Sequence, residues 1–137
     1  MNIQLPHIPE RTKKPRNNGI TMMMDKGLSL RQAENFVEAS GEFTDIVKLG
    51  FGTSVITNKL EEKIQLYKNA GIKVYLGGTL FEAFIIRNMM DDYLKWLDKL
   101  KLDTVEVSDG SIIMNHDKKC ELINKISKNF TVLSEVG

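Results

Sequence analysis

The 137-residue sequence has one cysteine, three prolines and no long apolar run, and each shortage excludes a class of protein. Because Cys120 is the one cysteine, an intramolecular disulfide is impossible, and a reducing cytoplasm is the expected compartment. No run approaches the roughly 18 apolar residues of a membrane-spanning helix. The N-terminus is polar and lacks the apolar segment of a signal peptide. The sequence therefore predicts a cytoplasmic protein that does not enter a membrane.

An excess of charge of one sign is also missing, since the formal net charge is +1. A protein that binds nucleic acid through phosphates needs a basic surplus, so no nucleic-acid partner is expected. The composition is 42% hydrophobic and 27% charged, which is typical of one globular domain.

All three prolines lie within residues 1–18, together with the basic residues Arg11, Lys13, Lys14 and Arg16. This composition predicts an irregular N-terminal arm, followed by one folded unit over 19–137. Such a basic cluster is either solvated or in contact with an anion, and the pattern leaves both open.

The remaining sequence alternates between apolar runs of strand length and segments with helical spacing. The expected strands cover 19–24, 45–49, 72–76, 103–108 and 131–136. The expected helices cover 30–39, 59–69, 80–87 with 91–100 after a break near Asn88, and 116–128. Ser29, Asn58 and Asn115 are the candidate N-caps. Five alternating strands predict right-handed βαβ units and a parallel sheet of the α/β class.

Two parallel architectures fit this alternation: an open doubly wound sheet and part of a (β/α)₈ barrel. The strands favour the barrel, because each has one mostly apolar face and one face with polar groups near its C-terminal end. In the fourth strand, for example, Val105 and Val107 oppose Glu106 and Ser108. A complete barrel needs about 250 residues. The expected fold is therefore a TIM-type barrel truncated after its fifth strand.

The same alternation assigns the faces of the first strand. It places Met22 and Met24 toward the helices, and Met23 and Asp25 toward the barrel interior.

Four carboxylates are thereby expected at one rim, the C-terminal mouth: Asp25, Glu106, Asp109 and Glu135. Hard oxygen ligands of this kind suit Mg²⁺, which takes one or two protein carboxylates together with water and substrate oxygens. Helix capping and pairing with lysines are the structural alternatives. Lys48 is expected in the same mouth, paired either with an anionic substrate or with Glu106.

Two glycine-containing turns follow strands and precede helices: Gly50-Phe51-Gly52-Thr53-Ser54 and Gly77-Gly78-Thr79. Backbone N–H groups at such turns can hold anions, although tight-turn geometry alone also explains the pattern. His7 and His116 have no partner at the spacing of a metal site or catalytic triad. Cys120 is interpreted as an unreactive thiol in a helix.

Seven ordered motifs together resemble phosphosulfolactate synthase. They are Lys14-Pro15-Arg16, Asp25-Lys26-Gly27-Leu28, Val47-Lys48-Leu49-Gly50-Phe51-Gly52-Thr53-Ser54, Leu60-Glu61-Glu62-Lys63-Ile64, Gly77-Gly78-Thr79-Leu80-Phe81-Glu82, Glu106-Val107-Ser108-Asp109-Gly110 and Ser134-Glu135-Val136-Gly137. The resemblance covers residues 13–137. It implies a (β/α)₈ barrel that adds sulfite to phosphoenolpyruvate with Mg²⁺, giving (2R)-phospho-3-sulfolactate, the first step of coenzyme M synthesis in methanogens.

The resemblance also implies roles for the residues of the mouth. The catalytic residues would be Lys48 and Glu106. The substrate-binding residues would be Lys26, Gly52, Thr53, Ser54, Gly77, Gly78, Thr79 and Ser108. The metal ligands would be Asp25, Asp109 and Glu135.

One part of the family pattern lies beyond Gly137: a lysine pair after the Glu-Val-Gly turn, whose first member is the proposed general acid. The chain is accordingly expected to be the N-terminal part of the enzyme, a lyase by family and a homo-oligomer. The alternative is a non-catalytic fragment, or a heat-stress-related interaction protein, on the same scaffold.

Overall fold

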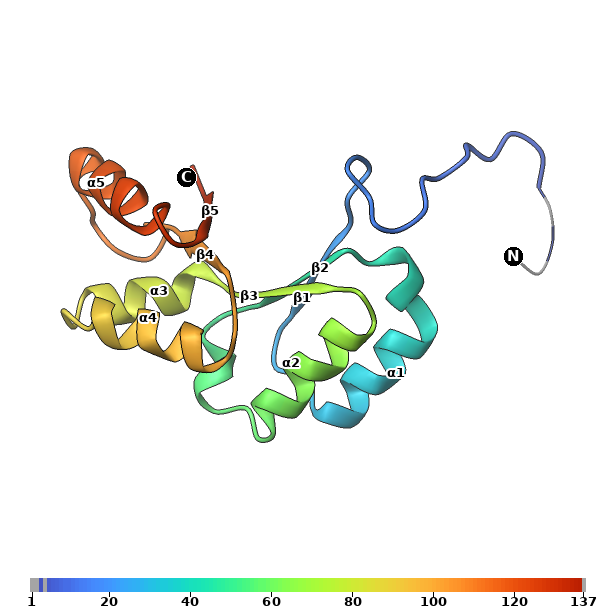
Figure 1. The fold of residues 1–137 in the computed structure, drawn as a ribbon, viewed down its shortest axis with the longest axis horizontal. Coiled ribbons are helices and arrows are strands. Elements are labelled where there is room, and N and C mark those ends of the chain that lie inside the picture. The colour runs from blue at the N-terminus through green and yellow to red at the C-terminus, as the bar shows by residue number, and fades with distance from the viewer. Residues whose placement is uncertain (1–2, 4, 137) are drawn as a thin grey trace.

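The computed structural model of the chain describes residue 3 and residues 5–136, and it shows a five-stranded parallel sheet with strand order β1-β2-β3-β4-β5 (Figure 1). The strands are β1 (Met22–Asp25), β2 (Ile46–Leu49), β3 (Lys73–Leu76), β4 (Thr104–Val107) and β5 (Thr131–Ser134). A doubly wound sheet reverses its strand order at a switch point, whereas barrel strands follow one another around the ring. The sequential order therefore confirms (β/α) units of the barrel type.

Helices connect the strands at the expected places. They are α1 (Leu30–Ser40), α2 (Leu60–Asn69), α3 (Gly78–Ile85), α4 (Met90–Lys99) and α5 (His116–Ile126), with 3₁₀ turns η1 (Gly41–Phe43) and η2 (Thr53–Val55). The predicted break near Asn88 is confirmed, because this residue adopts a φ of 56° between α3 and α4.

Two of the three predicted N-caps are confirmed. The Ser29 side chain accepts a hydrogen bond from the Gln32 N–H, and that of Asn115 accepts one from the Asp117 N–H. The prediction for Asn58 is wrong, since α2 is preceded by Lys59 at a φ of 57° with no side-chain cap.

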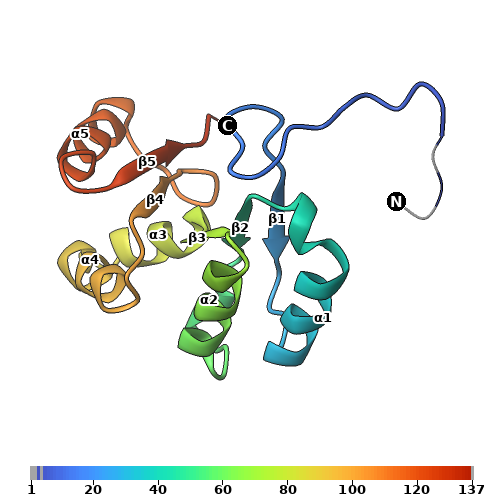
Figure 2. The ribbon, with the colours of Figure 1, turned by 45° about the vertical axis from the view of Figure 1, so that its right-hand side comes forward.

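The helices lie along one side of the curved sheet and leave the other side open (Figures 1 and 2). Apolar side chains of the central strands fill the space under the helices: Val47, Leu49, Val74, Leu76, Val105 and Val107. This is the outer layer of a barrel, in which strand side chains pack against surrounding helices.

The predicted assignment of the β1 side chains to the two faces of the sheet is wrong, because each set lies on the opposite face from the one predicted. Met23 pairs with Val47 and Asp25 with Leu49, so both belong to the side covered by helices. Met22 and Met24 lie on the open, inner side and are exposed. Methionines lie on both faces of this strand, so the apolar pattern does not show which face meets the helices. The pairing with β2 does show it.

The N-terminal arm is not simply solvated, although residues 5–18 form neither helix nor strand. Arg16 is bonded to Asp45 at 2.8 Å, and the Lys14 ammonium donates to the carbonyl oxygen of Gly41 at 2.8 Å. Burial would raise the pKa of Asp45, but the Thr21 N–H and the Arg16 guanidinium outweigh it and hold that pKa below its usual range. The basic cluster thus contacts the N-terminal ends of the strands.

None of the helices in the described part of the chain has the length and apolar composition of a membrane-spanning segment.

Candidate active site

Lys48, Glu106 and Glu135 form the centre of the candidate site, and we call them the mouth cluster. The Lys48 ammonium donates to Glu106 Oε1 at 2.7 Å and to Glu135 Oε1 at 2.8 Å. The three residues come from the C-terminal ends of β2 and β4 and from the position just after β5. Strand parity predicted that they share one face, and their direct contact confirms this placement.

The charge of Lys48 is stabilised by its two partners. Burial alone would lower the pKa of this ammonium, but the hydrogen bonds and charges of Glu106 and Glu135 outweigh burial and raise it. The hydrogen bond from Lys48 in turn lowers the pKa of Glu135 against the opposing effect of burial. Lys48 therefore stays protonated and Glu135 ionised at neutral pH.

Glu106 also anchors the first turn of α3. Its Oε1 accepts a hydrogen bond from the Gly78 N–H at 2.8 Å, at the point where the helix begins. Because the first N–H groups of a helix have no partner within the helix, the Glu106 carboxylate satisfies one of them. The buried Glu106 thus links β4 to both Lys48 and the Gly77-Gly78 turn.

Residue 78 must be glycine because a larger side chain would not fit there, and not because of its backbone angles. A Cβ there would lie 2.2 Å from Ser108 Oγ and 2.7 Å from Glu106 Oε1. We expect Gly78→Ala to lower the free energy of unfolding by about 1–3 kcal/mol, the usual effect of overpacking. Urea denaturation measures it, with Gly110→Ala as the control because a Cβ at Gly110 meets nothing within 4 Å. Equal stability of the two variants would contradict this packing.

Glu82 is a residue of the mouth region whose contacts the sequence interpretation missed. Its buried carboxylate accepts a hydrogen bond from the Ser108 hydroxyl and others from the N–H groups of Gly110 (3.0 Å) and Ser111 (2.8 Å). It therefore fixes the loop that follows β4. Glu82 belongs to one of the quoted motifs, but its helical position gave no indication of which loop it contacts.

Asp109 and Lys119 form a second ion pair beside the mouth cluster. Lys119 of α5 donates to Asp109 Oδ1 at 2.7 Å and to the backbone oxygen of Glu135 at 2.5 Å. This lysine ties the β4–α5 loop to the segment after β5. Asp109 is thus placed at the mouth as predicted, while its role in metal binding remains a prediction.

Asp25 is not placed at the mouth, and that expectation is wrong. Its side chain is fully buried on the helix side, where Oδ2 contacts Lys63 Nζ at 2.9 Å and the Tyr67 hydroxyl at 3.0 Å. Oδ1 accepts the N–H groups of Gly27 and Leu28 at 2.8 and 2.7 Å. These four partners hold the β1–α1 loop against α2.

The predicted substrate-binding residues do not all lie together. Gly77, Gly78 and Ser108 surround the mouth cluster. Lys26 and Thr53 line a separate cavity of about 590 Å³ between the β1–α1 and β2–α2 loops. Thr79 is exposed on α3.

The Gly52-Thr53-Ser54 turn adopts a defined geometry. Gly52 has a φ of 69°, and the Thr53 hydroxyl donates to the Gly50 carbonyl at 2.8 Å. The Ser54 hydroxyl is buried, and none of the described residues forms a hydrogen bond with it. The turn geometry explains Gly52 and Thr53, whereas the Ser54 hydroxyl remains able to form a hydrogen bond.

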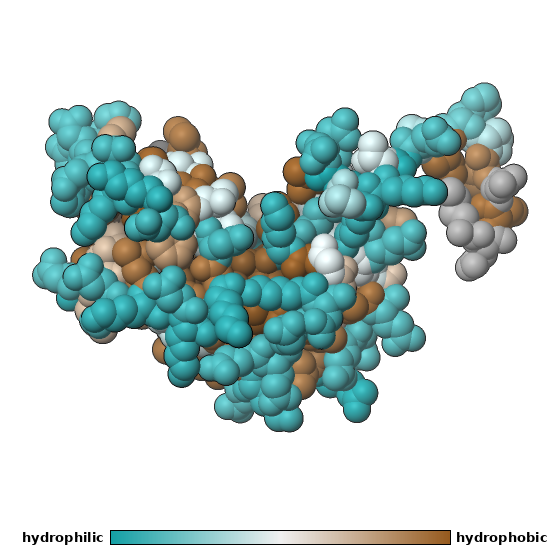
Figure 3. Space-filling view, viewed as in Figure 1, coloured by the Kyte–Doolittle hydropathy of each residue, from teal (hydrophilic) through white to brown (hydrophobic). Residues whose placement is uncertain are grey.

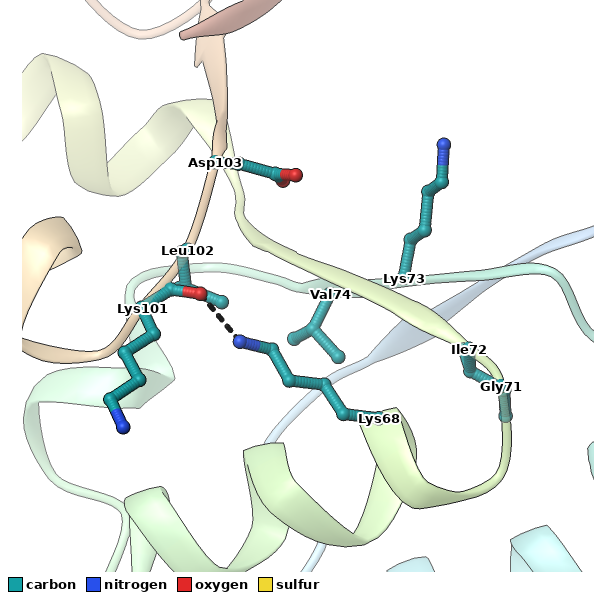
Figure 4. Close-up of a pocket in the computed structure, with 8 residues that line it drawn as sticks. All are labelled: Lys68, Gly71, Ile72, Lys73, Val74, Lys101, Leu102 and Asp103. Atoms are coloured by element: carbon teal, nitrogen blue, oxygen red, sulfur yellow. Dashed lines mark hydrogen bonds between the residues drawn. The ribbon is translucent and has the colours of Figure 1, made fainter.

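Another cavity, of about 270 Å³, lies at the opposite end of the strands (Figure 4). Lys68, Lys73, Lys101 and Asp103 line it, and Lys68 donates to the Lys101 carbonyl oxygen at 2.5 Å. It opens at the N-terminal ends of β3 and β4, whereas barrel enzymes carry their chemistry at the C-terminal ends. It is therefore not the candidate active site.

The formal charge of the mouth region is negative. Four carboxylates, Glu82, Glu106, Asp109 and Glu135, stand beside two ammonium groups, Lys48 and Lys119. In the part of the chain that the structure describes, no three Asp, Glu, His or Cys side chains gather in a metal-binding arrangement. A divalent cation held by one or two carboxylates would balance the excess charge.

Comparison with known proteins identifies the family. The family model described as (2R)-phospho-3-sulfolactate synthase (ComA) matches residues 9–137. The chain belongs to this family of enzymes. Within that family, it is similar to proteins named phosphosulfolactate synthase from two archaea and one bacterium.

The sequence identities of these relatives are moderate, and their alignments cover most of this chain. The protein of Methanothermobacter thermautotrophicus is 36% identical over 132 residues, 94% of this chain and 51% of the relative. That of Methanocaldococcus jannaschii is 40% identical over 122 residues, 87% of this chain and 49% of the relative. That of Bacillus subtilis is 35% identical over 130 residues, 95% of this chain and 52% of the relative. The chain spans about half the length of the curated relatives it matches.

The mouth cluster is expected to make stability depend on pH at both extremes. Glu135 has a lowered pKa, so its contribution is present above its ordinary value of 4.5 and is lost as pH falls through the folded value. Lys48 has a raised pKa, so its contribution is present below 10.5 and is lost as pH rises through the folded value.

We therefore expect Glu135→Gln to reduce the acid loss of stability and Lys48→Met to reduce both losses. Unfolding free energies measured across pH test this expectation. The controls are Glu61→Gln and Lys99→Met, which alter an exposed pair 3.7 Å apart. Identical pH profiles for mouth and control variants would show that the cluster does not carry the effect.

Proposed function

We propose that this chain supplies part of the catalytic mouth of a phosphosulfolactate synthase, a lyase that adds sulfite to phosphoenolpyruvate to give (2R)-phospho-3-sulfolactate. The observation that carries the proposal is the mouth cluster at the C-terminal ends of the strands in a chain of this family. The proposal includes a cytoplasmic setting, with coenzyme M synthesis as the pathway in methanogens.

The reaction joins two anions, so positive charge is required where they meet. Sulfite sulfur bonds to the methylene carbon of phosphoenolpyruvate, the carbon–carbon π electrons move toward the carboxylate, and a proton is then delivered to C2. Lys48, kept protonated by its two partners, is the cation of this chain that we assign to the anionic substrates. Glu106 acts on it by holding the ammonium in place.

We propose Mg²⁺ as the cofactor, with Glu135 and Asp109 as the carboxylates that would hold it. The side chain of Glu135 is 56% exposed and that of Asp109 is 26% exposed, so each is accessible to an ion. Mg²⁺ needs only one or two protein carboxylates when water and substrate complete its shell. When bound, it supplies positive charge to the phosphoenolpyruvate carboxylate. Asp25, whose oxygens face α2, is omitted from this set.

Binding of phosphoenolpyruvate tests the proposal directly. Calorimetric titration with and without Mg²⁺ should show binding that Lys48→Met weakens at least tenfold, while Lys99→Met leaves it unchanged. Failure to bind under either condition, or equal binding by the two variants, would contradict the assignment of Lys48.

Turnover is expected to be negligible for this chain alone. General acid catalysis contributes typically ~10²–10⁴-fold, and the family's acid lies outside the motifs present here. Barrels also often bind phosphate through loops after strands 7 and 8. An assay of sulfite-dependent phosphoenolpyruvate consumption measures this, with the complete Bacillus subtilis relative as reference. A rate near the reference would show that these 137 residues are sufficient.

A second copy of this chain is the partner that we propose, in addition to the small-molecule substrates. The open inner side of the sheet is the surface that supports it, and the test is given in the Discussion.

A further inference from the structure

His116 and Cys120 lie one turn apart on the exposed side of α5, outside the candidate active site. The Cys120 sulfur and His116 Nε2 are in hydrogen-bond contact at 3.5 Å. Both residues are exposed, and Cys120 is the one cysteine of the sequence. The sequence interpretation gave His116 no partner at metal-site spacing and Cys120 no reactivity, but residues four apart on a helix face each other.

The distance between the two atoms matches the bite of a tetrahedral metal ion. Zinc bonds to sulfur at about 2.3 Å and to imidazole nitrogen at about 2.0–2.1 Å, so the tetrahedral angle places these atoms about 3.6 Å apart. The observed 3.5 Å lies within a tenth of an ångström of this value. The same i, i+4 spacing presents the two histidines of helical zinc sites. An ion can therefore bridge the pair while the helix keeps its geometry.

The surrounding charges do not oppose a cation at this position. Asp117 follows His116 in the sequence. Lys118 is neutralised by Glu121 at 2.9 Å, and Lys119 is bound to Asp109 at the mouth. The lysines closest in sequence are thus both paired with carboxylates.

We propose that His116 and Cys120 form a two-ligand site for a thiophilic divalent cation of the Zn²⁺ class, with water in the remaining positions. A nitrogen–sulfur pair selects such ions, whereas the oxygen ligands of the mouth suit Mg²⁺. The site is independent of the function proposed above.

Titration with Cd²⁺ tests the site, because a cadmium–thiolate bond absorbs in the ultraviolet and this chain has a single thiol. With a thiol-free reductant present, we expect a saturable absorption band that excess Zn²⁺ removes. Cys120→Ser should abolish the band, and His116→Ala should weaken Cd²⁺ binding at least tenfold.

His7→Ala is the matched control, since it removes the other histidine, which lies in the arm, and should leave the titration unchanged. Circular dichroism before metal addition verifies that the variants fold. Unchanged Cd²⁺ affinity in His116→Ala would overturn the proposal by reducing the site to a lone thiol. Absence of a saturable band in the unsubstituted chain, or an equal loss in His7→Ala, would overturn it as well.

Discussion

Asp25→Ala is expected to lower the free energy of unfolding by about 3–5 kcal/mol, because it leaves Lys63 as a buried charge without its partner. The Lys63 side chain is 1% exposed and contacts the fully buried Asp25 at 2.9 Å. Among the described residues, its ammonium would retain the hydrogen bond to the Leu28 carbonyl oxygen at 2.8 Å and no carboxylate partner. Domains are stable by only about 5–15 kcal/mol in total, so this single change can unfold much of the population. Urea denaturation followed by circular dichroism measures it.

The double variant Asp25→Leu with Lys63→Met separates the effect of the unpaired charge from that of lost packing. Replacing both members of a buried ion pair by apolar residues is often neutral or stabilising. We expect the double variant to recover most of the stability that Asp25→Ala loses. A loss below about 1 kcal/mol for Asp25→Ala would mean that water reaches Lys63 and that the pair does not fix the β1–α1 loop.

Self-association is the second large effect expected, and it originates in the open inner side of the sheet. Figure 3 shows brown hydrophobic surface in the hollow between the two raised ends of the molecule. Met22 is 52% exposed and Leu133 is 37% exposed, and they belong to the two edge strands β1 and β5. Unpaired strand edges recruit other strands. At ~25 cal/mol per Å² of apolar surface, a few exposed side chains amount to several kcal/mol.

Sedimentation velocity at several concentrations should therefore show dimers or larger species at micromolar concentration, or a partly molten chain with weak near-ultraviolet circular dichroism. Leu133→Lys should shift the distribution toward monomer. Ile86→Lys is the control, because Ile86 is 58% exposed but lies at the end of α3 on the helix side. A compact monomer with a sharp tertiary signal would contradict the expectation.

Much of the architecture followed from local patterns. Apolar runs of strand length alternate with helical spacing, and short connections between such units admit a parallel sheet with sequential strands. The caps at Ser29 and Asn115 were predictable because their hydrogen bonds reach only two or three residues along the chain. The mouth cluster was predictable as well, since Lys48 and Glu106 are charged residues in strands whose opposite face is apolar, and Glu135 follows the last strand with the same alternation.

The order of the elements, the parallel sheet and the face shared by Lys48 and Glu106 could be predicted because they depend on periodicity within single segments. The pairing of Asp25 with Lys63 and the binding of the loop after β4 by Glu82 became visible only in the folded chain. The partners in these contacts are 38 and 28 residues apart. Their contact depends on which face of β1 meets α2 and on where α3 lies beside β4. No local pattern encodes either, because both are set by the packing of side chains from different segments.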